Sequence, residues 1–171
     1  MNKKLEKEIN SQIQKELYSA YLYLSMAAYF EARGLDGFGR WMQFQAQEEI
    51  LHAMKFFTFV NDRGGRVVLE AIEKPPADFK SIKDVFTRTL DHEKKVTASI
   101  NNLYKVAQTA NDTAAQIMLQ WFITEQVEEE KNPSDILTKL DFIHKEDSAG
   151  ILMLNKELGA RVQPTMNSAE D

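Results

Sequence analysis

The sequence predicts an all-α protein: a four-helix bundle with a long crossover between its second and third helices and a short fifth helix near the C-terminus. Glycine and proline stand at only a few places along the chain. Between them, apolar residues recur at steps of three and four, which is the period of a helix face. The crossover is predicted over 66–80, where Pro75 and Pro76 bar a helix.

The first two helices are expected to form an antiparallel pair. The first spans 4–33 and is broken by Gly34-Leu35-Asp36-Gly37, and the second spans 38–63 and is closed by Gly64-Gly65. The connection over 66–80 can extend to about 50 Å, whereas a helix of about 27 residues is about 40 Å long. The connection can therefore cross the whole bundle, so that the third helix starts at the opposite end.

Capping residues set the bounds of the next two helices. Ser81 can cap a third helix over 82–110, with Asp84 three residues further on. Asn111-Asp112 makes a tight turn and caps a fourth helix over 112–144.

The C-terminal part of the chain is less regular. Pro133 removes a backbone donor inside the fourth helix, which predicts a kink or a new cap. A shorter amphipathic segment over 146–160 is the expected fifth helix. The polar tail over 162–171 is expected to be disordered.

Length and composition fit one soluble domain over 1–171. The chain has 171 residues, of which 43% are hydrophobic and 27% charged, which suits a single core. No apolar run approaches the roughly 20 residues that a membrane span needs. The charged start, Met1–Glu6, lacks the features of a secretory signal, so the cytoplasm is the expected compartment.

Cysteine content and charge narrow the possible chemistry. With no cysteine, a metal would have to be bound by oxygen and imidazole ligands. The net charge is −5 and no Lys/Arg stripe is present, which argues against nucleic-acid binding. Cations are therefore favoured as partners over anions.

Each of the four long helices carries an acidic residue on an otherwise apolar face, near its middle. Residues at mid-height meet at one level of a bundle whichever way each helix points, so these side chains are expected to converge. The polar residues concerned are Glu16 in the first helix, Glu49 and His52 in the second, Glu93 in the third, and Gln126 and Glu129 in the fourth.

Such a cluster predicts a metal centre. An isolated buried charge loses several kcal/mol of solvation, and no lysine or arginine lies on these faces near that level. Divalent cations are the natural counter-charge, and carboxylates with one imidazole suit Fe(II), Mn(II) or, less specifically, Zn(II). Glu49 and His52 stand at i and i+3, which turns both toward one metal. A lone Glu-x-x-His is weak support, but glutamates on three other helices strengthen it.

Each residue taken alone also has an ordinary structural interpretation. A single glutamate on such a face is more often a solvated residue at a misjudged helix angle, and His52 alone would more often be a hydrogen-bonded core histidine. Tyr23 fits a core aromatic and a hydrogen-bond donor to a ligand carboxylate equally well. Four other residues are given structural places: His92 and His144 at the surface, and Trp41 and Trp121 in packing.

Three further glutamates, Glu48, Glu125 and Glu128, stand beside the central ones. They fit either a looser additional metal site or ordinary surface charge, and both interpretations stay open.

Three segments resemble motifs of the non-haem ferritins of bacteria and archaea: Glu16–Tyr23, Glu48–His52 and Leu119–Glu130. The resemblance extends over 5–158. It implies a ferritin-like bundle that oxidises Fe(II) with O2 or hydrogen peroxide and stores Fe(III) as a mineral. It also implies a hollow shell of about 24 identical subunits, with the fifth helix at the four-fold contacts, and no haem.

By position, the resemblance implies two irons per subunit and a third iron position, with Glu49 bridging the first two. The implied ligands are Glu16, Glu49 and His52 for the first iron, Glu49, Glu93 and Glu129 for the second with Gln126 nearby, and Glu48, Glu125 and Glu128 for the third.

Two departures from the family pattern bear on function. Gln116 and Leu119 stand where ferritins with acidic three-fold channels carry carboxylates, which leaves the iron entry route open. Pro133 follows Glu129 by one turn and could shift that ligand.

Related functions make different demands on the sequence. A bacterioferritin would have histidine in place of Glu129 and a haem-ligating methionine in place of Ile50 or Leu51. A rubrerythrin-like peroxidase would have paired Glu-x-x-His motifs and usually cysteines. A non-catalytic assembly subunit would lose the glutamates and His52. A di-iron oxygenase or manganese catalase needs the same metals plus a substrate pocket, and stays open.

Overall fold

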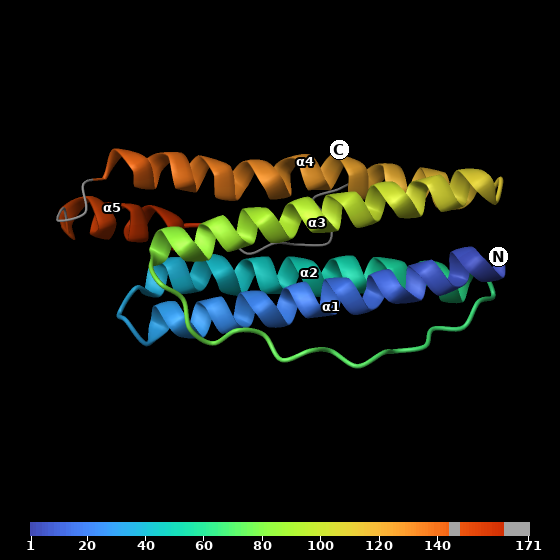
Figure 1. The fold of residues 1–171 in the computed structure, drawn as a ribbon, viewed down its shortest axis with the longest axis horizontal. Coiled ribbons are helices and arrows are strands. Elements are labelled where there is room, and N and C mark those ends of the chain that lie inside the picture. The colour runs from blue at the N-terminus through green and yellow to red at the C-terminus, as the bar shows by residue number, and fades with distance from the viewer. Residues whose placement is uncertain (144–147, 163–171) are drawn as a thin grey trace.

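The computed structural model describes residues 1–143 and 148–162, and within them it forms a helical bundle (Figure 1). α1 packs against α2, and α3 against α4. None of the helices in these residues is long and apolar enough to cross a membrane. The predicted fold class is confirmed. The helices are α1 Lys3–Glu31, α2 Asp36–Asp62, α3 Ile82–Thr109, α4 Thr113–Phe142 and α5 Ser148–Gly159.

The glycine breaks end α1 and α2 as predicted. Gly34 has a φ of 70° and Gly64 a φ of 65°, a left-handed conformation that glycine adopts without steric cost. The N–H of Leu35 donates to the Phe30 carbonyl at 3.1 Å, which turns the chain back on itself. α2 then begins at Asp36, two residues before the predicted start, because the last two residues of the break are already helical.

The crossover connects the end of α2 to the start of α3 at the other end of the bundle, lying along α1 (Figure 1). Asn10 of α1 holds its beginning: its Nδ2 donates to the Arg66 carbonyl at 3.0 Å, and its Oδ1 accepts from the Val68 N–H at 2.8 Å. Near its other end, Ser25 donates to the Pro76 carbonyl at 2.6 Å. These side chains satisfy backbone groups that no secondary structure pairs.

The predicted caps of α3 and α4 are present. The Ser81 hydroxyl accepts from the Asp84 N–H at 3.1 Å, and Asp112 accepts from the Ala115 N–H at 3.1 Å. α4 runs without a break through Pro133 to Phe142, so the alternative of a new cap at this proline is wrong. His144 and the tail over 163–171 lie outside the described residues.

Asp112 has a second role, which predicts a measurable effect on stability. It pairs with both terminal nitrogens of Arg63, at 2.9 and 3.0 Å, and so ties the end of α2 to the start of α4. We expect Asp112→Ala to lower the free energy of unfolding by about 2 kcal/mol, combining a lost cap with a lost bidentate pair. Asp135→Ala, which breaks only an exposed pair with Lys131, should cost under about 0.5 kcal/mol. Urea unfolding of both variants measures the difference.

The apolar core has two halves separated by a polar level. One half includes Phe30, Phe38 and Phe86 and is shared by α1 to α5. The other includes Leu5, Phe56 and Phe122 and is shared by α1 to α4. The glutamates of the predicted metal centre lie between the two halves, because they interrupt each apolar stripe near its middle.

Two aromatic predictions have different outcomes. Trp41 is buried and packs edge-on against Phe86, as predicted. His92, predicted at the surface, is half-buried: its Nε2 lies 2.7 Å from the Ser19 hydroxyl, and its ring meets that of Tyr23 edge-on. Burial lowers the His92 pKa to about 4, so the ring is neutral at pH 7. The surface prediction is wrong because α1 covers a position that lies off the central stripe of α3.

Candidate metal centre

Six polar side chains from four helices meet between the two apolar halves of the core. None of them is more than 4% exposed, because each replaces one apolar residue in a stripe that faces the bundle axis. They are Glu16 of α1, Glu49 and His52 of α2, Glu93 of α3, and Gln126 and Glu129 of α4.

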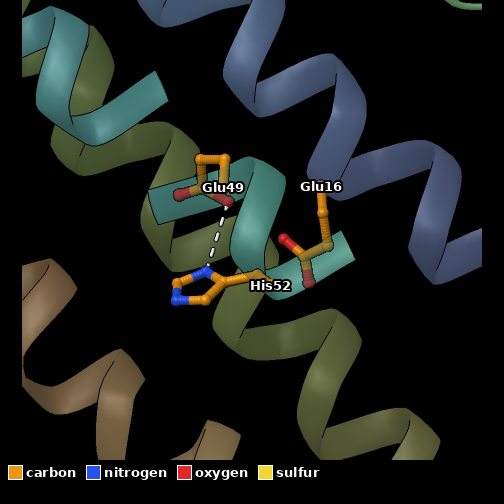
Figure 2. Close-up of side chains that lie close together, drawn as sticks. All are labelled: Glu16, Glu49 and His52. Carbon is orange, nitrogen blue, oxygen red and sulfur yellow. Dashed lines mark ion pairs between the residues drawn. The ribbon is translucent and has the colours of Figure 1, made fainter. Parts of the chain in front are cut away.

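Ligand atoms of the cluster form two groups, each compact enough to hold one metal ion. Glu16, Glu49 and His52 offer one atom each within 4.8 Å of one another, and Figure 2 shows the Glu16 side chain directed from α1 toward the other two. Nδ1 of His52 lies 3.5 Å from Oε2 of Glu49. The second group, Glu49, Glu93 and Glu129, meets the same limit. Glu49 belongs to both groups and can bridge two ions.

Amide and phenol groups donate hydrogen bonds to the carboxylates of the cluster. Gln12 donates to Oε1 of Glu16 at 2.9 Å, and Gln45 donates to Oε2 of Glu129 at 2.7 Å. Glu93 accepts from the Tyr23 hydroxyl on one oxygen and from Gln126 at 3.2 Å on the other. Such bonds fix the direction of a ligand without neutralising its charge.

Two carboxylate oxygens are buried without a hydrogen-bond partner among the described residues: Oε2 of Glu16 and Oε2 of Glu49. Both belong to the group drawn in Figure 2. A buried oxygen without a partner costs about 1–3 kcal/mol, and a cation would supply the missing interaction. The donor set of carboxylates and one imidazole suits Fe(II), Mn(II) or, less specifically, Zn(II).

Burial also raises the pKa of each of these carboxyls. The pKa of Glu93 is about 7 and that of Glu129 about 8. Burial, followed by the neighbouring charges of Glu93 and Glu16, raises the Glu49 pKa well above its usual range. Burial therefore favours protonated carboxyls in the metal-free centre, and a cation that binds there would displace protons.

A protein-family model described as "Ferritin-like domain" matches residues 6–143. The chain belongs to the ferritin family. A probable bacterial non-heme ferritin-like protein of Haemophilus influenzae is 39% identical over 159 residues, covering 93% of this chain and 96% of that protein. A bacterial non-heme ferritin of Staphylococcus aureus is 36% identical over 163 residues, covering 94% and 96%.

Solved structures agree with this assignment. The open-pore ferritin of the archaeon Archaeoglobus fulgidus superposes with a TM-score of 0.93 at 48% identity, covering 95% of this chain and 99% of that one. A closed form of the same ferritin, engineered by mutagenesis, gives the same TM-score and identity, covering 96% and 99%. This ferritin chain is thus similar in sequence to bacterial and archaeal ferritins and has the fold of the archaeal one.

The three residues that the resemblance implied for a third iron lie in different environments. Glu125 of this ferritin is half-buried, and its carboxylate forms a third compact group with His52 and Glu129. Glu48 instead forms an ion pair with Arg161, while Glu128 is exposed. Of the three, only Glu125 belongs to one of the metal-sized groups among the described residues. Burial raises the Glu125 pKa, and Glu48 and Glu128 lie near enough for their charges to raise it further.

Three residues that hydrogen-bond to the centre or to its neighbours were not predicted from the sequence: Gln12, Gln45 and Arg161. Gln45 could have been predicted, because it is a polar residue on the apolar stripe of α2. Gln12 lies one position off the α1 stripe, and Arg161 lies beyond the last helix, so no spacing rule points to either. Trp121, predicted as a packing residue, meets the His52 ring edge-on at 5.5 Å between centroids.

Tyr23 provides a test of how the second group is held. Its ring is buried in the apolar core and its hydroxyl donates to Oε1 of Glu93, so both predicted roles are present together. We expect Tyr23→Phe to weaken divalent-cation binding at that group about tenfold, measured by calorimetric titration with Co(II). The matched control is Tyr29→Phe. Tyr29 is a buried tyrosine on the same helix and packs against Phe30 and Phe79, so this variant should bind Co(II) like the unmodified chain.

Proposed function

We propose that this ferritin stores iron and is a ferroxidase, which oxidises Fe(II) with O2 or hydrogen peroxide inside each subunit. The observation that carries the proposal is the position of Glu49, which belongs to both metal-sized groups. Its buried Oε2 has no hydrogen-bond partner among the described residues and lies 3.5 Å from Nδ1 of His52. A shared carboxylate holds two Fe(II) ions close together, typically about 3.5–4 Å apart. That arrangement lets two one-electron donors act on one oxidant.

In this proposal the six residues have separate roles. Glu16, Glu49 and His52 hold the first iron, and Glu49, Glu93 and Glu129 hold the second, with Gln126 hydrogen-bonded to Glu93. Tyr23 orients Glu93. Carboxylates are hard ligands that favour Fe(III) over Fe(II), and so few protein ligands leave room for the oxidant and for departure of the product.

The electron balance requires two irons for each oxidant molecule. Two Fe(II) ions become two Fe(III) ions and release two electrons. O2 with two protons accepts them to give hydrogen peroxide, and hydrogen peroxide with two protons accepts them to give two water molecules. The Fe(III) product then hydrolyses and is stored as a mineral.

The storage compartment in this proposal is a cytoplasmic shell of about 24 copies of this chain, as the family resemblance implies. Exposed apolar residues support assembly, because a single chain leaves them in water. Tyr21, Leu24, Ile50 and Met54 are exposed on α1 and α2, and Leu152 and Met153 on α5. Contacts between copies would cover them.

An anaerobic Fe(II) titration followed by exposure to air tests the function. The irons oxidised rapidly are counted per chain, and the assembly is sized by light scattering. Rapid oxidation of about two irons per chain on a large shell supports the proposal. A third rapidly oxidised iron per chain would indicate an additional site, for which Glu125 is the candidate. Slow oxidation equal to that of Fe(II) in buffer would remove the ferroxidase assignment.

A further inference from the structure

Arg161 lies just beyond α5 but contacts α2 beside the metal centre. Its Nη1 donates to Oε1 of Gln45, and its Nη2 donates to Oε2 of Glu48. The guanidinium also lies over the Trp41 ring, with 5.2 Å from Cζ to the centroid. The side chain is thus held by an ion pair, a hydrogen bond and a cation–π contact at once.

The contact with Gln45 has a direction. Arginine only donates hydrogen bonds, so Gln45 must present its oxygen to Arg161 and its NH₂ group to the opposite side. There the NH₂ group meets Oε2 of Glu129 at 2.7 Å. Gln45 is 1% exposed, so water cannot take over either partner. When Glu129 is ionised, as it would be on binding a cation, a reversed amide would place two acceptor oxygens face to face.

The packing of α5 against α2 determines where Arg161 lies. Asn155 of α5 accepts from the Phe38 N–H at 3.1 Å and donates to Asp36 at 3.1 Å, both in the first turn of α2. Leu154 and Leu158 are buried in the same half of the core as Trp41. The end of α5 is therefore anchored on α2, and Arg161 follows it by two residues.

We propose that Arg161 is a positioning residue for the metal centre: through Gln45 it holds Glu129 in the direction needed by the second metal ion, and through Glu48 it keeps that carboxylate away from a third. This inference rests on the proposed function, because it assigns Glu129 to the second ion. Two consequences of opposite sign follow. Without Arg161, the second ion should bind more weakly, and Glu48 should become free to bind an additional cation.

Anaerobic calorimetric titration of the assembled protein with Co(II) tests both consequences, since Co(II) accepts the same oxygen and imidazole ligands. In Arg161→Ala we expect the Co(II) affinity of one of the two sites per chain to fall about 10- to 100-fold. The affinity of the other site should not change, and one additional, weaker site should appear. Arg161→Lys should fall between, because an ammonium cannot donate to two partners as the planar guanidinium does.

Gln45→Leu distinguishes the route through the amide from a general effect of charge. It should weaken the same single site, and the double variant Arg161→Ala/Gln45→Leu should weaken it no further, because the two residues act in series. Lys156→Ala, an exposed cation on α5, is the matched control and should match the unmodified chain. Melting temperature and shell size are compared for every variant.

The inference is overturned if Arg161→Ala binds two Co(II) ions like the unmodified chain, if both sites weaken equally, or if the double variant shows additive losses. Its failure differs from failure of the proposed function. An unmodified chain that binds two Co(II) ions but oxidises Fe(II) no faster than buffer contradicts the ferroxidase proposal and leaves the effect of Arg161 on binding intact.

Discussion

Replacing Glu49 by glutamine is expected to abolish rapid Fe(II) oxidation and, at the same time, to stabilise the metal-free protein at pH 8. Glu49 is the carboxylate shared by both metal-sized groups. Glutamine has nearly the same shape but no charge, so it cannot bridge two cations. We expect the rapid phase of about two irons per chain to disappear, a far larger loss than removal of a ligand that serves one iron.

The gain in stability follows from the raised pKa of Glu49. Its pKa in the folded chain lies well above the usual 4.5, so above pH 4.5 the unfolded chain binds fewer protons than the folded one, and stability falls as pH rises. Glutamine has no proton to lose. The advantage of Glu49→Gln should therefore be small near pH 4.5 and reach about 2 kcal/mol at pH 8.

Thermal unfolding of metal-free protein at the two pH values measures this difference. Asp62→Asn, an exposed position at the end of the same helix, is the control and should change neither property. If Glu49→Gln were less stable than the unmodified chain at pH 8 without metal, the negative charge of Glu49 would be compensated by a partner in the folded chain. That result would contradict the conclusion that burial among other carboxylates destabilises this charge.

Gly37→Ala is expected to destabilise the chain by about 3 kcal/mol, the upper part of the usual range for overpacking. A Cβ at this position would lie 1.8 Å from the Asn155 carbonyl oxygen and 2.6 Å from its carbon. Both atoms belong to the backbone of α5, so neither can turn aside. α5 would have to move off α2, which would break the Asn155 contacts with Phe38 and Asp36.

Gly39→Ala is the matched control, two residues further along the same helix. The three atoms nearest to a Cβ there all belong to the flexible side chain of Glu31, with Oε1 at 2.6 Å, and this side chain can rotate away. Because alanine favours a helix by up to about 1 kcal/mol over glycine, this variant should be as stable as the unmodified chain or slightly more so. The free energies of unfolding of the two variants, measured with a chemical denaturant, test this difference. Equal effects would show that α5 does not depend on close contact at Gly37.

The fold could be predicted from the sequence because its strongest signals are local. Helix breaks at Gly34 and Gly64 and the cap at Asp112 depend on the preferences of single residues. The convergence of Glu16, Glu49, Glu93 and Glu129 depends only on helix period and height. That these residues bind iron stays a proposal, because geometry alone does not identify the ion.

The errors concern contacts that periodicity does not encode. Of the two outcomes predicted at Pro133, only the new cap is wrong. The helix continues because Ile136 and Leu140 beyond it are buried in the core, and their burial offsets the lost backbone hydrogen bond. His92 was misplaced because the depth of a residue beside the stripe depends on how closely α1 approaches. Arg161 reaches Glu48 only through the tertiary seat of α5.

The division of the core into two apolar halves has a consequence for turnover of the cargo. Each half is built from aromatic and aliphatic side chains that need no ion to pack, and the acidic level between them can hold protons instead of metal. Unlike a zinc finger, whose metal supplies the folding energy, such a subunit would keep its shape while ions come and go. In the proposed shell, the subunits would therefore stay folded and assembled before iron enters, while it is stored and after it is released.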